Sequence, residues 1–204
     1  MRRLLILALI VFATLYAWQK HKVQQRDKRH QAVSLAAYAF GAVPQQQATQ
    51  QAAFAFGDYK IQPLATFWLK ARILSRENYW ADEGAKLSPL DLALGWQRMA
   101  DPTVYEKLNI AQGSRWYHYS WRDQPPIPLP EIIESSANMH MIPADAEVAR
   151  QLEQAKAGKM IKLKGLLVEV THPKGWRWRS SLSRSDSGDG SCEVIFVEAA
   201  EIVD

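Results

Sequence analysis

The pattern of hydrophobic and polar positions divides the chain into an apolar start, a polar low-complexity stretch and a longer region of mixed character. Leu4 to Trp18 carries no charged residue and lies between Arg2-Arg3 and a cluster of Lys and Arg within residues 20–29. As a helix this run spans about 22 Å, which is shorter than a hydrocarbon core of about 30 Å. Snorkelling basic side chains and local bilayer thinning compensate for the difference. The pattern therefore predicts a single transmembrane anchor over 1–20 that contacts the lipid bilayer through 4–18.

A cleaved signal peptide and a peripheral or buried segment are the alternatives for this apolar run. Cleavage after Ala17 would put Leu15 where a small residue is required, so we favour an uncleaved signal anchor. More Lys and Arg follow the run than precede it, which by the positive-inside rule favours a cytoplasmic domain. However, that orientation requires the charged N-terminal tail to cross the membrane, and long domains translocate largely regardless of charge. We expect a single-pass protein of the bacterial inner membrane with a periplasmic domain, and the cytoplasmic face stays open as the alternative.

Residues 21–56 combine the basic cluster with a stretch that is rich in Ala and Gln and almost free of charge. This composition predicts a basic flank and a low-complexity tether that holds the rest of the chain away from the bilayer. A partner-binding segment built on Phe54 and Phe56 is the alternative. From residue 57 the composition changes and includes seven of the eight tryptophans. The length of 57–204 suits one globular domain.

The first part of this domain alternates between helix and strand signals. Ala65 to Ile73 is apolar with partial alternation, which predicts a strand or a short helix. Ser88-Pro89-Leu90-Asp91 has Ser as N-cap, Pro at N1 and an acid at N3, and this pattern predicts a helix start. Asp101-Pro102 repeats the pattern and predicts a second helix, and Asp145 is expected to cap a third. Arg115 to Trp121 is aromatic and alternating, which predicts a strand.

The β-rich part of the domain is expected over about 138–204. Residues 159–170, 176–182 and 192–197 predict three antiparallel strands. Gly165 lies inside the first of them, where a bulge or sharp bend would curve the sheet. The expected fold class is α+β: one transmembrane helix, then a globular domain with short helices and a C-terminal antiparallel sheet or small barrel of the OB or SH3-like kind.

A candidate ligand-binding surface follows from the aromatic, basic and hydroxyl side chains near the end of the chain. Tryptophan rings provide stacking faces for bases, sugars or proline-rich peptides, and guanidiniums with hydroxyls bind phosphate or carboxylate. The predicted ligand-binding residues are Trp176, Arg177, Trp178, Arg179, Ser180, Ser181 and Arg184. The alternative is that the rings pack as cross-strand pairs and the polar side chains form a solvated face.

The sequence contains no motif that marks a catalytic or metal site. No G-x-S-x-G or S-x-x-K motif occurs, and no two of the five histidines are spaced at i, i+3 or i, i+4. Asn138 to Met141 is expected to be a half-buried strand rather than a copper site. We therefore expect no cofactor, no metal and no catalytic residue. An envelope hydrolase that uses Ser180 or Ser181 with His140 or His172 is the enzymatic alternative.

The net charge of +4 is modest, and much of the positive excess lies beside the predicted anchor. This distribution disfavours nucleic acid as a partner of the folded part. The expected partners are the lipid bilayer and an envelope protein. The single cysteine allows no internal disulfide, so redox chemistry does not decide the compartment.

Three stretches carry a resemblance to a family: Ser88 to Trp96, Ser136 to Ala144 and Trp178 to Leu182. They resemble segments of an uncharacterised bacterial family of membrane-anchored proteins, and the resemblance extends from about Asp58 onward. It implies a bacterial inner-membrane setting and brings no activity, cofactor or substrate.

These observations favour a membrane-anchored, non-enzymatic interaction or accessory module at the bacterial inner membrane. An OB-like binder of nucleic acid or oligosaccharide is a further alternative, for which Trp176 and Trp178 must be exposed beside Arg177 and Arg179.

Overall fold

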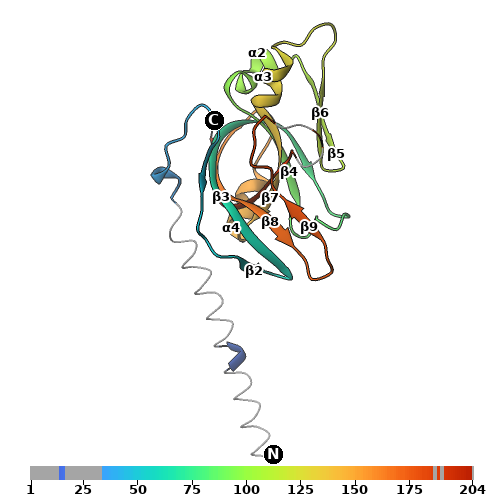
Figure 1. Cartoon of the computed structure of the whole chain (residues 1–204). Coiled ribbons are helices and arrows are strands. Elements are labelled where there is room, and N and C mark those ends of the chain that lie inside the picture. The colour runs from blue at the N-terminus through green and yellow to red at the C-terminus, as the bar shows by residue number, and fades with distance from the viewer. Residues whose placement is uncertain (1–13, 17–33, 186–187, 189–190, 204) are drawn as a thin grey trace, which may run out of the picture.

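The computed structural model describes residues 14–16, 34–185, 188 and 191–203. In these ranges the chain is mostly β-sheet with a few short helices (Figure 1). The predicted anchor over 1–20 and the basic flank up to residue 33 lie outside the described residues, apart from 14–16, which are helical. No helix among the described residues is long and apolar enough to cross a membrane.

The longest strand, β3 (Tyr59–Asn78), organises the sheet. Buried and more exposed positions alternate along its first part, as expected of a strand with one face in a core. Its length lets it pair with β8 (Met160–Thr171) over its first part and with β4 (Leu90–Gly95) over its second, both antiparallel. The segment 65–73, for which strand and helix were both predicted, is therefore a strand.

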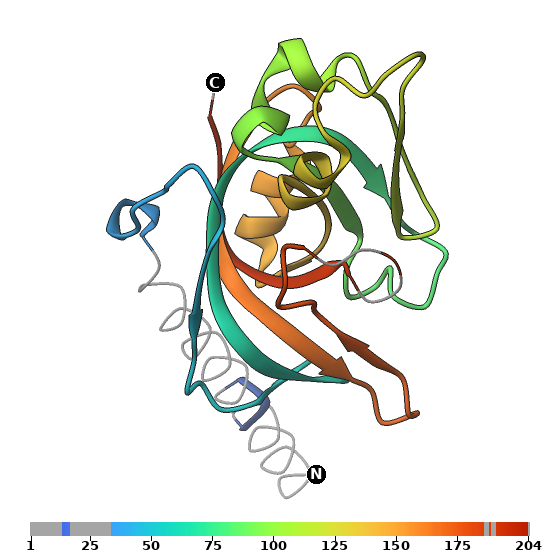
Figure 2. The same ribbon diagram turned by 45° about the horizontal axis from the view of Figure 1, so that its top comes forward.

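The strand pairings close into a ring, which we call the barrel. β4 pairs with β7 (Ser136–Pro143) antiparallel, and β7 pairs with β10 (Glu193–Val203) parallel. β10 in turn pairs antiparallel with β8, which returns to β3. Figure 2 looks into the curved strands of this ring. The predicted C-terminal strands are confirmed, and the short β9 (Arg177–Arg179) pairs with the C-terminal end of β8.

Apolar side chains from all five barrel strands fill the interior. They include Phe67, Leu69, Leu92, Leu94, Met139, Met141, Leu163 and Ile195. The helix α4 (Ala146–Glu153) adds Val148 and Leu152 to this core. The predicted cap of this helix is confirmed, because the carboxylate of Asp145 accepts a hydrogen bond from Val148 N at 2.8 Å.

Gly165 lies at a close approach of β8 to β10. A Cβ atom at this position would be 2.2 Å from the carbonyl oxygen of Phe196, so only glycine fits. The register of the two strands shifts between Val197, the partner of Gly165, and Ala199. The irregularity expected near Gly165 is thus present, and it lies in the partner strand.

The predicted helix start at Ser88 is wrong. Leu90–Gly95 is strand β4, and each of its positions is buried. The local pattern favours a capped helix, but β4 hydrogen-bonds to β3 on one side and β7 on the other, and this tertiary pairing overrides local preference. Leu92 and Leu94 enter the barrel core, so the alternating Asp91 and Ala93 face outward.

The segment expected to be a tether contributes to the sheet. Within it lie η1 (Leu35–Ala37), β1 (Gln45–Ala48) and β2 (Phe54–Phe56), and both strands pair with β3. Phe54 and Phe56 place their ring centroids 5.1 and 5.2 Å from that of Phe196. These aromatic contacts attach the segment to the outside of the barrel.

A separate two-stranded hairpin stands beside the barrel, at the right of Figure 1. It consists of β5 (Asn109–Gly113) and β6 (Trp116–Ser120), so the aromatic strand predicted over 115–121 is confirmed. Short helices connect it to the barrel strands: η2 (Gln97–Ala100), α2 (Pro102–Tyr105) and α3 (Leu129–Glu134). The predicted cap of α2 is also confirmed, because Asp101 accepts a hydrogen bond from Thr103 N at 2.9 Å.

Candidate ligand-binding site

The candidate site lies on the outer face of β4 and β7. Asp91 and His140 are direct cross-strand partners, and both alternate with residues of the barrel core. Their side chains therefore point outward, yet both are buried under other elements. A buried carboxylate beside an imidazole on the outside of a barrel needs polar partners, since an unpaired buried charge is costly.

Arg115 is the main partner of the Asp91 carboxylate. Its Nη1 donates to Asp91 Oδ1 at 2.9 Å and to the carbonyl oxygen of Ser88 at 2.8 Å. Its Nε and Nη2 donate to the two carboxylate oxygens of Asp82 at 3.1 and 2.8 Å. One guanidinium thus joins the hairpin, the β3–β4 loop and β4, with a bidentate pair to Asp82.

Arg115 reaches this position because of the turn that joins β5 and β6. The two turn residues, Ser114 and Arg115, have φ values of 51° and 69°. A two-residue hairpin turn with both φ angles positive normally favours Asn-Gly, and a left-handed arginine is uncommon. The four hydrogen bonds of the guanidinium hold the residue in this conformation.

Tyr79 and Asp82 both contact the guanidinium of Arg115, and the pKa of each differs from its usual value. The Tyr79 ring centroid lies 3.7 Å from Arg115 Cζ, and burial raises the pKa of Tyr79 to about 12. Burial also favours a higher pKa for Asp82, but the hydrogen bonds and charge of Arg115 outweigh it and hold that pKa below its usual value. At neutral pH Tyr79 is therefore a neutral phenol and Asp82 a carboxylate.

Asn138 and His140 complete the surroundings of Asp91. Asn138 Nδ2 donates to Asp91 Oδ2 at 3.3 Å and to the carbonyl oxygen of Arg115 at 3.0 Å. His140 Nδ1 lies 2.9 Å from Asp91 Oδ1, but it is not aligned for a hydrogen bond, so this contact is a close approach of two polar groups. The His140 ring centroid is 4.4 Å from that of Trp178.

A cavity of about 530 Å³, which we call the main pocket, opens above this network. Three elements surround it: the β3–β4 loop, the β5–β6 hairpin and the segment that contains β9. Its lining includes Asp82, Glu83, Arg115, Trp116, His140, Cys192 and all four residues of 176–179. The volume lies within the range of about 300–1,000 Å³ that is typical of small-ligand sites.

The β9 segment supplies the aromatic wall of the main pocket. Trp176 and Trp178 are half-buried, with ring centroids 5.7 Å apart in an edge-to-face arrangement. Between and beyond them, Arg177 and Arg179 both donate to Glu169 Oε2, at 2.7 and 2.6 Å. These two hydrogen bonds hold the pKa of Glu169 below its usual value.

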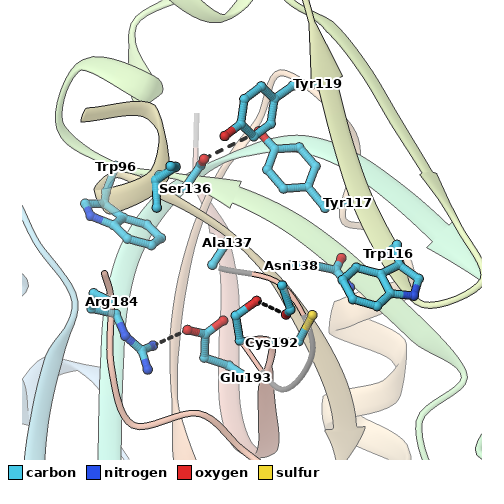
Figure 3. A pocket seen from close by; sticks show the side chains of 13 residues that line it. Trp96, Trp116, Tyr117, Tyr119, Ser136, Ala137, Asn138, Arg184, Cys192 and Glu193 are labelled. Atoms are coloured by element: carbon cyan, nitrogen blue, oxygen red, sulfur yellow. Dashed lines mark hydrogen bonds and ion pairs between the residues drawn. The ribbon is translucent and has the colours of Figure 1, made fainter. Parts of the chain in front are cut away.

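Figure 3 shows a smaller cavity of about 170 Å³, which we call the side pocket. Aromatic side chains line it from several elements: Trp96, Trp116, Tyr117 and Tyr119. Its polar groups include Asn138 and an ion pair in which Arg184 Nη1 lies 2.6 Å from Glu193 Oε1. Trp116 and Cys192 line both pockets.

The structure separates the predicted ligand-binding residues into three groups. Trp176, Arg177, Trp178 and Arg179 line the main pocket, and Arg184 lines the side pocket. Ser180 and Ser181 are buried instead. Ser180 Oγ donates to the carbonyl oxygen of Ser181 at 2.8 Å and accepts from Val194 N at 3.1 Å, so it joins the β9 segment to β10.

The two histidines of the enzymatic alternative, His140 and His172, each contact other groups of the protein. His140 faces Asp91, whereas His172 Nδ1 accepts a hydrogen bond from Lys174 N in a turn. In the described part of the chain, no group of three or more His, Cys, Asp or Glu side chains is arranged to hold a metal ion.

Sequence reasoning missed Asp91 and Arg115, and it considered His140 only for the enzymatic alternative and for a copper site. One signal was present: an acidic residue alternates with leucines in Leu90-Asp91-Leu92, which in a strand places a carboxylate opposite the core face. The incorrect helix assignment hid this signal. Nothing in the sequence indicates that Arg115 reaches Asp91.

Comparison with protein-family models, with curated proteins and with solved structures gives no match for this chain. The site is therefore interpreted from its own geometry.

Proposed function

We propose that this chain is a non-enzymatic accessory module of the bacterial inner membrane whose domain binds a neutral oligosaccharide in the main pocket. The location of the pocket on the barrel is the observation that carries the proposal. In an OB-like barrel, ligands bind on the second and third strands, between the loop that follows strand one and the loop between strands four and five. Here those strands are β4 and β7, and those loops supply Asp82 and Trp178 to the pocket lining.

The order of the strands supports the OB-like assignment. Counted along the chain, the barrel strands are β3, β4, β7, β8 and β10, and the fifth lies between the third and the fourth. The pairing of the third strand with the fifth is parallel, and α4 lies between the third and the fourth. This arrangement is that of a five-stranded Greek-key barrel.

The charges at the site favour a neutral ligand. Each arginine that lines either pocket has a carboxylate partner: Asp82 and Asp91 for Arg115, Glu169 for Arg177 and Arg179, and Glu193 for Arg184. In addition, residues 34–204 carry 18 Lys and Arg against 20 Asp and Glu. A nucleic acid requires an excess of positive charge along its path, and the described domain lacks that excess.

The aromatic wall favours a ligand with flat apolar faces and many hydroxyls. Trp176 and Trp178 are half-buried, so one part of each ring packs on the protein and another part faces the pocket. A sugar ring can place its apolar C–H face on such a ring. Its hydroxyls can then reach the carboxylates of Asp82 and Glu83, which the β3–β4 loop contributes to the lining of the same pocket.

The membrane setting in this proposal rests on the apolar run over 4–18 and its basic flanks. With the domain in the periplasm, an anchored binding module meets the oligosaccharides of the cell envelope. An anchor of this kind restricts the domain to a layer close to the bilayer, which raises its effective concentration towards a ligand at the same surface.

Binding is tested with the full-length protein in detergent micelles against a panel of glucose, galactose and N-acetylglucosamine oligomers and an oligo-dT strand. We expect binding to at least one oligosaccharide and a loss of affinity of about 5- to 150-fold in Trp178→Ala, because one ring stack contributes about 1–3 kcal/mol. Trp80→Ala is the matched control, since Trp80 is 90% exposed and lines neither pocket. Binding to oligo-dT alone, or to no member of the panel, would overturn the proposal.

A further inference from the structure

We infer that the main pocket and the side pocket are two subsites of one groove, which takes an extended chain of several sugars rather than a single sugar. This inference rests on the proposed function and specifies its ligand. Two residues, Trp116 and Cys192, line both pockets, so the two cavities adjoin at these side chains.

The size of the side pocket supports its role as an extension. At about 170 Å³ it lies well below the volume of an independent small-ligand site. The adjoining main pocket, at about 530 Å³, lies within that range. A ligand in the side pocket is therefore expected to be the end of a chain whose remainder occupies the main pocket.

Like the main pocket, the side pocket is lined by aromatic side chains and by an arginine that is paired with a carboxylate. Tyr117 and Tyr119 point from β6 towards it, with ring centroids 5.4 Å apart, and Trp96 lies on another side (Figure 3). Burial raises the pKa of both tyrosines, so their hydroxyls stay protonated; that of Tyr117 donates to Ser136 Oγ at 3.5 Å. The charge of Arg184 is balanced by Glu193, as the charges in the main pocket are balanced.

Hydrogen bonds and ion pairs hold the residues beside the boundary between the subsites in place. Asn138 lines the side pocket, and three hydrogen bonds fix its side-chain amide: to Asp91, to Arg115 and from Gln112 Nε2 at 2.6 Å. Trp116 begins β6 directly after Arg115, so the ion pairs of Arg115 hold the backbone next to it. With 38% of its surface exposed, Trp116 has ring area available to a sugar that crosses the boundary.

The first test is the dependence of affinity on ligand length. Oligomers of one to six sugars from the series that the protein binds are titrated into the full-length protein in detergent micelles. We expect the affinity to rise about tenfold or more between the disaccharide and the hexasaccharide, since further ring contacts are added. Tyr119→Ala and Trp116→Ala should each remove most of this gain, and Tyr119→Ala should leave the disaccharide affinity within about twofold.

A second measurement requires no variant. Cys192 is the single cysteine of the chain and lies at the boundary, so bound hexasaccharide should slow its alkylation by iodoacetamide severalfold. Trp80→Ala is the control for the titrations.

The outcomes separate the two proposals. Equal affinity for the disaccharide and the hexasaccharide, or an unchanged rate of Cys192 alkylation, would overturn the two-subsite groove and leave the binding function intact. A Tyr119→Ala protein with an unchanged urea midpoint that loses the disaccharide as well would also overturn it. Failure of every oligosaccharide to bind would remove the proposed function itself.

Discussion

Arg115 Nη1 lies 2.9 Å from Asp91 Oδ1, and this ion pair connects the β5–β6 hairpin to the outer face of the barrel. The carboxylate of Asp91 is fully buried, whereas 18% of the Arg115 side chain is exposed. The hairpin forms its own two-stranded sheet and lines one side of the main pocket. The ion pair between Arg115 and Asp91 therefore connects this side of the pocket to the barrel.

Arg115→Ala should therefore destabilise the protein by about 3 kcal/mol, because it leaves a buried carboxylate without its main partner. Urea unfolding followed by tryptophan fluorescence measures the change. Arg150→Ala is the matched control: Arg150 pairs with Glu147 on the exposed face of α4, and its loss should cost less than about 0.5 kcal/mol.

The double variant Arg115→Ala/Asp91→Asn tests the cause of that loss. It removes the uncompensated charge together with the arginine, so part of the lost stability should return. A double variant that is no more stable than Arg115→Ala would mean that the guanidinium acts through packing alone.

Gly165→Ala should destabilise the barrel by about 3 kcal/mol, because the new methyl group would lie 2.2 Å from the Phe196 carbonyl oxygen. The strands β8 and β10 must then separate or lose hydrogen bonds. Gly113→Ala is the control, since a Cβ there meets no atom within 4 Å, and its effect should be within about 0.5 kcal/mol. Similar urea midpoints for both variants would contradict the close approach.

Protonation of Glu169 should lower the stability of the protein in acid. Its folded-state pKa lies below the usual 4.5 because Arg177 and Arg179 donate hydrogen bonds to it. A carboxylate with a lowered pKa contributes stability that is complete above its unfolded-state pKa and is lost as the pH falls through the lowered value. In Glu169→Gln, urea midpoints measured between about pH 3 and pH 6 should therefore fall less steeply with acid than in the wild type. Parallel curves for the two proteins would show that this carboxylate does not contribute.

The proposed periplasmic location of the domain predicts the behaviour of fusions after Asp204. A phosphatase that is active only outside the cytoplasm should be active, and a fluorescent protein that folds only in the cytoplasm should remain dark. The opposite result would mean that the excess of Lys and Arg after the apolar run governs the orientation. The domain would then face cytoplasmic ligands, and oligo-dT would become the first probe to repeat.

Where local pattern and tertiary environment agree, the sequence was sufficient. Asp101 and Asp145 were predicted as caps and cap their helices, because a cap depends on hydrogen bonds within a few residues. The strand containing Gly165 was predicted for a similar reason, since alternation and an internal glycine are local features. At Ser88 the same local reasoning failed, because pairing of β4 on both sides outweighed a good capping pattern.

The candidate site shows the same division. From the sequence alone it was possible to determine the chemical types present, including the tryptophans and arginines of 176–179 that line the main pocket. The tertiary structure was needed to show that Asp91 and His140 lie side by side and that Arg115 reaches Asp91 from 24 residues further along the chain. Such contacts depend on strand register and on a left-handed turn, and neither is encoded by residues that are neighbours in the sequence. The residue types that line the pocket were thus predictable from the sequence, whereas the pairing of the barrel strands determines which of these residues contact one another.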